Sequence, residues 1–281
     1  MAKLPLSPGK VLGVVREVRK AGAAGPLLVA GAPGTAQAVR DALVAGGDSE
    51  AVRDLSGSTP SPYDFEGAEV VVYAIEGERA TEDDEKVLRL AGRKAVEIVC
   101  VVVGTPPGVT PTIPYVLDTD ILAVPEGAPL PVGEIAERVS ARAEDSAHAL
   151  AARLPALRPA VVERIVKSVS QQNGFLGVAI FIPGADFPVL TVNQIRMVLQ
   201  IAAAHGEPID LERAVEIVPL IGFAFGFRSA ARQLVGIVPG FGWAVKGGMA
   251  YAGTRALGEA AAAYFAAGGT ERLRRSVRSW S

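Results

Sequence analysis

Three continuous runs of apolar residues mark the first half of the chain: Pro26–Ala30, Glu69–Ile75 and Val96–Val103. Apolar runs of this length are typical of strands that are buried on both faces, as in a parallel sheet covered by helices. Two shorter candidate strands follow at Ile113–Leu117 and Ile121–Val124.

The segments between these runs have the apolar spacing of amphipathic helices. Helices are predicted over Ser7–Ala24, through Ala38–Ala45 and over Val132–Arg153, and residues 56–62 are predicted to be a loop. Thr81 is expected to cap a further helix, because acidic residues follow it and favour the first turn. Strands that alternate with helices predict a small doubly wound parallel sheet, so residues 1–153 are assigned to one α/β domain.

From Leu154 onward the pattern is helical and rich in Gly and Ala, which predicts an apolar α-helical domain over 154–270 and a basic tail over 271–281. One helix is expected to begin at Val161 and to end at Asn173-Gly174. Thr191–Gln194 has the spacing of a capping box, so the next helix is expected to begin at Thr191. The polar residues Ser168–Asn173 and Asn193-Gln194 are interpreted as capping and helix-ending groups.

Composition narrows the function classes. The formal charge of -2 over 281 residues gives no overall bias toward nucleic acid, and no nucleic-acid partner is predicted. The single cysteine, Cys100, lies in an apolar run and excludes a disulfide framework. His148 and His205 are far apart in sequence, with no cysteine nearby, so no metal site is predicted. The N-terminal residues lack the apolar core of a secretory signal, and a cytoplasmic or membrane-associated location on the cytoplasmic side is expected.

The loop after the first apolar run, GAPGTAQA over Gly31–Ala38, begins as a phosphate loop does. The G-x-x-x-x-G-K-[ST] pattern then fails, because Ala36 replaces the second Gly and Gln37 replaces the Lys. Ala38 also replaces the magnesium-binding hydroxyl, so hydrolysis is not expected. Backbone amides at a helix N-terminus can still attract an anion. Four residues are the candidates for such an anion or nucleotide: Gly31, Gly34, Thr35 and Gln37. No cofactor is expected, and GTP is the ligand to test.

Two further positions bear on nucleotide chemistry. Asp64–Gly67 spells the D-x-x-G pattern of GTPases but precedes an apolar run, so it is interpreted as a surface turn. The segment Gly104–Pro107 follows the third run and contains neither the Asn nor the Asp of a guanine-reading motif. The order of strands and loops resembles a shortened Era-like GTPase domain that has lost its nucleotide chemistry.

The helical half carries a second resemblance, over about residues 155–268. Its P-x-L-T-x-N-Q segment at Pro188–Gln194 and its G-T-x-A-L-G-x-A-x-x-x-Y-F segment at Gly253–Phe265 look like domain-of-unknown-function family 697, found behind Era-like GTPase domains. The resemblance implies membrane association or an accessory role to a GTPase, and no catalytic residue.

Membrane association stays open on physical grounds. Val215–Phe227 and Gln233–Val245 are apolar, but each is shorter than the roughly 20 residues that a spanning helix needs. Helical hairpins that dip into a bilayer and a tightly packed soluble bundle both fit the recurrent small residues. The tail has four arginines beside Trp280, which suits an anionic lipid surface or a solvated tail equally.

Three functional hypotheses result. The first is a non-catalytic, membrane-associated interaction or regulatory protein with a pseudo-GTPase-like domain. The second is a nucleotide-binding switch or weak NTPase. The third is a soluble scaffold that pairs with itself or with a GTPase.

Overall fold

The computed structural model describes residues 8–22, 25–179, 187–209 and 242–269. The chain divides into two compact units, one of residues 23–161 and one of residues 1–22 together with 162–281. The predictions for Val215–Phe227, for residues 233–241 and for the tail at 271–281 lie outside the described residues.

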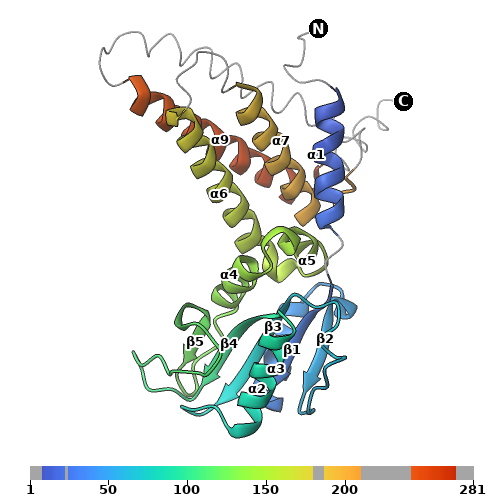
Figure 1. The fold of residues 1–281 in the computed structure, drawn as a ribbon, viewed down its shortest axis with the longest axis vertical. Helices are drawn as coiled ribbons and strands as arrows, with labels where there is room; N and C mark the ends of the chain where they lie inside the picture. The colour runs from blue at the N-terminus through green and yellow to red at the C-terminus, as the bar shows by residue number, and fades with distance from the viewer. Residues whose placement is uncertain (1–7, 23–24, 180–186, 210–241, 270–281) are drawn as a thin grey trace. The chain divides into compact units, whose positions relative to one another are not determined.

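The unit of residues 23–161 contains a five-stranded parallel sheet in the order β2-β1-β3-β4-β5 (Figure 1). Its strands are β1 (Leu27–Gly31), β2 (Val52–Ser56), β3 (Val70–Glu76), β4 (Glu97–Val103) and β5 (Ile121–Val124). The predicted parallel α/β class is confirmed. The prediction of a strand at Ile113–Leu117 was wrong, since this segment is a turn in which Tyr115 has a φ of 69°. Strand β2 was not predicted.

Helices cover both faces of this sheet. They are α2 (Pro33–Val44), α3 (Glu82–Arg93) and α4 (Val132–Arg142), and α5 (Ala147–Arg153) contacts α4. Single 3-10 turns lie at Ser49–Ala51, Asp118–Asp120, Glu144–Ser146 and Pro155–Leu157. Helix α3 packs its buried residues against one face, around Tyr73 and Cys100, whereas α2 and α4 contact each other and the strands from the other face. This two-sided covering explains why the central strands are continuously apolar.

Helix α3 begins as predicted. The Thr81 hydroxyl accepts a hydrogen bond from the Asp84 N–H at 3.2 Å, and the Asp84 carboxylate accepts one from the Thr81 N–H at 2.8 Å. The helix predicted over Val132–Arg153 is instead interrupted after Arg142, where Glu144 has a φ of 42°. A left-handed residue cannot continue an α-helix, so the chain turns before α5.

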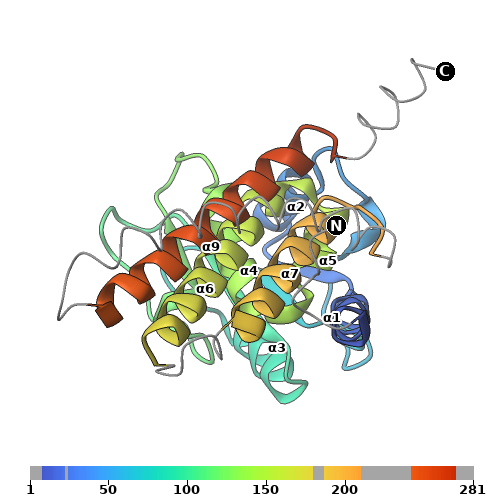
Figure 2. The same cartoon turned by 90° about the horizontal axis from the view of Figure 1, so that it is seen from above.

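The second unit consists of helices α1 (Pro8–Ala21), α6 (Arg158–Ala179), α7 (Phe187–Ala204) and α9 (Gly242–Ala266) in its described part. Helix α7 contacts both α1 and α9 and lies between them (Figure 2). The sequence-based boundaries grouped α1 with the sheet, whereas in the structure it packs on α7 in the helical unit. An ion pair at 2.8 Å between Glu17 and Arg196 joins the same two helices.

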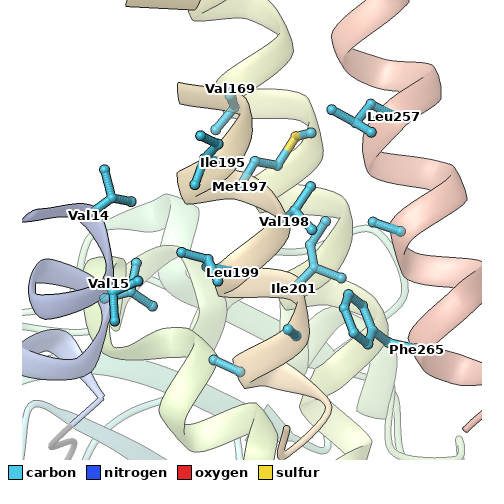
Figure 3. Close-up of a cluster of buried hydrophobic side chains, with 14 of the residues drawn as sticks. Val14, Val15, Val169, Ile195, Met197, Val198, Leu199, Ile201, Leu257 and Phe265 are labelled. Atoms are coloured by element: carbon cyan, nitrogen blue, oxygen red, sulfur yellow. The ribbon is translucent and has the colours of Figure 1, made fainter. Parts of the chain in front are cut away.

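The core of the helical unit is built around α7, whose side chains are buried on almost every side (Figure 3). Val14 and Val15 of α1 pack against it, as do Val169 of α6 and Leu257 and Phe265 of α9. Burying one such side chain contributes roughly 1.5–3 kcal/mol relative to leaving it in water.

The described helices include none with the length and apolar character needed to cross a membrane.

Candidate functional site

The first candidate site lies at the carboxyl ends of β1, β2 and β3, the edge where doubly wound sheets bind ligands. The strand order reverses direction between β1 and β3, and Gly31 ends β1 with a φ of 101°. A Cβ atom at Gly31 would lie 2.0 Å from the carbonyl oxygen of Ala74, so no side chain fits there. The first predicted site residue therefore lies at the expected edge, but the packing of β1 against β3 already requires its glycine.

A carboxylate lies over the first turn of α2. The Thr35 hydroxyl donates a hydrogen bond of 3.0 Å to Oε1 of Glu76, the last residue of β3. The same oxygen would be 3.5 Å from a Cβ atom at Gly34. The N-terminus of a helix carries a partial positive charge, so Glu76 supplies the negative charge that a bound phosphate would otherwise bring.

Gln37 does not join this site. Its side-chain amide donates to the Asp41 carboxylate at 3.1 Å, one turn further along α2. Arg40, the nearest cation on this helix, is also paired, at 3.1 Å with Asp41 and at 3.6 Å with Asp54. Of the four predicted residues, Gly34 and Thr35 thus lie beside Glu76, whereas Gly31 lies against Ala74 at the end of β1 and Gln37 bonds to Asp41.

The structure adds a feature that the sequence reasoning missed. The last three residues of β2, which pairs with β1, and the residue after it spell a D-x-x-G pattern, Asp54–Gly57. A Cβ atom at Gly57 would lie 3.2 Å from Pro33, so the two loops adjoin. Burial raises the pKa of Asp54, but hydrogen bonds from Ser56 and the charge of Arg40 outweigh it, and the pKa lies below its usual value. Assigning β2 from its apolar residues, Val52 and Leu55, would have revealed this pattern.

The other D-x-x-G segment, Asp64–Gly67, is a surface turn as predicted. The Asp64 carboxylate accepts hydrogen bonds from the N–H and hydroxyl of Ser61 at 2.7 and 2.8 Å. These bonds lower the pKa of Asp64. The carboxylate therefore bonds within its own loop.

A second candidate site is a buried polar seam between α6, α7 and α9. Asn173 of α6 donates to Thr254 of α9 at 3.0 Å and accepts from Asn193 of α7 at 2.9 Å. Gln194 also donates to the Thr254 hydroxyl, at 3.0 Å. Asn173 and Thr254 have no exposed surface, so these hydrogen bonds are made away from water.

The polar seam corrects two sequence-based interpretations. Thr191 and Gln194 do not cap a helix, because α7 begins at Phe187 and both residues lie buried inside it. Asn173-Gly174 does not end α6, which continues to Ala179. Gly174 instead allows close helix packing, since a Cβ atom there would lie 3.1 Å from the Tyr251 Cβ of α9. The spacing of Thr191 and Gln194 fits a cap and a buried helix face equally well, so the sequence alone could not separate them.

One more polar atom is buried in α6. The Ser170 hydroxyl, one turn before Asn173, has no exposed surface and no hydrogen-bond partner within the described ranges. Metal binding has no support here, because the described residues contain no cluster of three or more His, Cys, Asp or Glu side chains placed to hold an ion. The seam is made of neutral amides and hydroxyls, which suit helix-to-helix recognition rather than acid–base chemistry.

Searches against protein-family models, curated proteins and solved structures found no match to this chain. What is shown is therefore a parallel five-stranded α/β unit followed by helices.

Proposed function

We propose that this chain is a non-catalytic interaction or regulatory protein. In this proposal a GTPase-like α/β domain that has lost nucleotide chemistry is joined to a helical domain of the family 697 type. The observation that carries it is the Glu76 carboxylate over the first turn of α2, in contact with Thr35 at 3.0 Å. The strand order, which is common among doubly wound domains, is compatible with the GTPase-like part.

Electrostatics support the loss of nucleotide binding. Two like charges about 4 Å apart repel by about 1 kcal/mol in water and about 4 kcal/mol near a protein surface. A phosphate at the N-terminus of α2 would meet this repulsion from Glu76. It would find no lysine in the loop, because Gln37 stands in that position and its amide is bonded to Asp41.

Calorimetric titration of the full chain with GTP, GDP and ATP in the presence of magnesium tests this part. No binding is expected at millimolar nucleotide, whereas the double variant Glu76→Gln/Gln37→Lys should gain measurable affinity. The matched control is Glu78→Gln, which removes a charge from an exposed residue of the loop that follows β3 and should change nothing. Wild-type affinity in the micromolar range would refute the proposal.

A nucleotide-binding switch is the second candidate, favoured by the position of Asp54–Gly57 beside the β1–α2 loop. Under this alternative the wild-type chain binds nucleotide, and Gly34→Asp abolishes that binding. Asp54→Asn should then remove the dependence on magnesium.

The membrane part of the proposal concerns a peripheral contact or segments outside the described residues. Its support is the apolar, Gly/Ala-rich second half and the four arginines of residues 271–281. Co-sedimentation of the full chain with vesicles containing phosphatidylserine tests it, and recovery of all protein in the supernatant would reject it. Sedimentation velocity of the same sample tests the third candidate, a scaffold that pairs with itself.

A further inference from the structure

A groove of about 400 Å³ lies along β5. This strand is at one edge of the sheet (Figure 1). All four residues of β5 line it. One wall comes from the loop after β4, around Pro106 and Val109, and the other from the proline-containing segment after β5, around Ala128 and Pro129. Strand β5 therefore runs along the groove, and the loops before and after β5 form its two walls.

The backbone of β5 offers unpaired groups to this groove. The Val124 carbonyl accepts a hydrogen bond from the Gly104 N–H at 2.9 Å, so Val124 faces β4. Alternate residues of a parallel strand bond in opposite directions, which means that Leu122 also faces β4 whereas Ile121 and Ala123 face outward. The Ile121 N–H donates to the Asp118 carbonyl. Across the described ranges, the carbonyl of Ile121 and both backbone groups of Ala123 have no hydrogen-bond partner.

The side chains of the groove leave little for a charged metabolite to bind. The two charged residues that line it, Glu134 and Arg138, lie 3.6 Å from each other. Arg138 also donates to the Thr119 carbonyl at 3.0 Å. Most of the remaining lining residues are Pro, Gly, Ala, Val, Leu or Ile. The groups that remain to be satisfied are thus the backbone donor and acceptors of an exposed strand edge.

We propose that this groove binds an extended peptide segment of a partner protein, which adds to β5 as a further strand. The outward edge of β5 offers a carbonyl, an N–H and a second carbonyl in sequence. Another extended backbone can pair with this series, because it carries donors and acceptors in the complementary order. Pro125 follows β5 and has no N–H, so the paired stretch is short. The inference is independent of the nucleotide and membrane parts of the proposed function.

The test uses the full chain and a phage-displayed library of random 12-residue peptides as the probe. Enriched peptides are synthesised, and their affinity is measured by fluorescence anisotropy. Ala128→Trp, which fills the groove from an exposed wall position, should weaken binding at least tenfold. The matched control is Glu126→Trp, an exposed residue of the same segment that does not line the groove, and it should stay within twofold of wild type.

Hydrogen exchange distinguishes a peptide that pairs with β5 as a strand from a peptide that fills the groove in another way. A bound peptide should slow exchange of the Ala123 amide at least tenfold and leave the amides of Leu122 and Val124, already bonded to β4, unchanged. Ala123→Pro removes this outward N–H and should abolish binding while the circular dichroism spectrum stays that of wild type.

Three results would overturn the proposal. One is a library from which no peptide is enriched over a control protein. Another is binding that Ala128→Trp and Ala123→Pro do not weaken. The last is a micromolar homodimer that Ala128→Trp converts to monomer, since a second copy of the chain would then occupy the groove.

Discussion

The buried polar seam between α6, α7 and α9 makes the sharpest prediction about stability. The change is Thr254→Val, which keeps the shape of the side chain and removes its hydroxyl. That hydroxyl accepts hydrogen bonds from the Asn173 and Gln194 amides, both at 3.0 Å, and Thr254 has no exposed surface. In the variant each of these amides loses one hydrogen bond inside the bundle, and the Asn173 amide keeps only a longer one, of 3.4 Å, to the Leu190 carbonyl.

The magnitude comes from the cost of unsatisfied buried donors, about 1–3 kcal/mol for each. The added methyl group regains about 0.8 kcal/mol of apolar burial, so for two donors the expected net loss of unfolding free energy is about 1–5 kcal/mol. Thr254→Ser keeps the hydroxyl and deletes one methyl, and it should cost only about 1 kcal/mol. Thr254→Val is therefore predicted to be less stable than Thr254→Ser. If packing alone decided stability, Thr254→Ser would be the less stable of the two.

Urea denaturation followed by far-ultraviolet circular dichroism measures both variants. Because the chain has two compact units, hydrogen exchange of α7 amides assigns the loss to the helical unit. The double variant Asn173→Leu/Thr254→Val should cost less than the sum of its parts, since one orphaned donor is gone. A Thr254→Val protein at least as stable as Thr254→Ser would refute the claim that the hydrogen bonds of the polar seam stabilise the bundle.

Three further predictions concern packing, charge and burial. Gly247→Ala should lose about 1–2 kcal/mol, because the new Cβ would lie 2.4 Å from Val178 and overpacking outweighs the roughly 1 kcal/mol of helix propensity. The adjacent Gly248 has open space, so Gly248→Ala should gain about 0.5–1 kcal/mol in the same denaturation assay. Arg142→Met should cost about 2–4 kcal/mol at neutral pH, because it leaves the buried Asp120 carboxylate without its cation, and adding Asp120→Leu should recover part of the loss. Burial raises the pKa of the Cys100 thiol to about 12, so the native protein should resist 5,5′-dithiobis(2-nitrobenzoic acid) at pH 8 and react once unfolded. Rapid labelling of the native protein at pH 8 would contradict this burial of the thiol. The contribution of the thiol to stability is complete below pH 9 and is lost as pH rises toward 12, because Cys100 ionises first in the unfolded chain.

The sheet was largely predictable because its central strands are buried on both faces and therefore read as continuous apolar runs. Strands β1, β3, β4 and β5 follow the predicted runs within one residue at each end. Strand β2 escaped because it lies at an edge, where Arg53 and Asp54 interrupt the apolar pattern. An edge strand with charged residues gives no continuous run, and this omission also hid the D-x-x-G pattern at Asp54–Gly57.

The candidate sites were less predictable because both depend on contacts between distant residues. Glu76 ends a strand 41 positions after Thr35, and nothing local marks it as the group that faces α2. Asn173 and Thr254 are 81 positions apart, and local rules assign Asn173-Gly174 to a helix end. The glycine that favours such an end instead admits α9, so tertiary packing overrides the local preference.

The two glycines of the β1–α2 loop separate what the fold requires from what a ligand would require. Gly31 needs its φ of 101° and has the Ala74 carbonyl oxygen 2.0 Å from any Cβ, so the fold alone accounts for it. Gly34 has only Glu76 Oε1 near its Cβ position, at an ordinary 3.5 Å, and it is exposed in the first turn of α2. Packing therefore does not demand glycine at this second position. The glycine that begins the phosphate-loop pattern can therefore persist without any nucleotide. Whether a ligand binds at this edge depends on Gly34, Thr35 and the charge of Glu76.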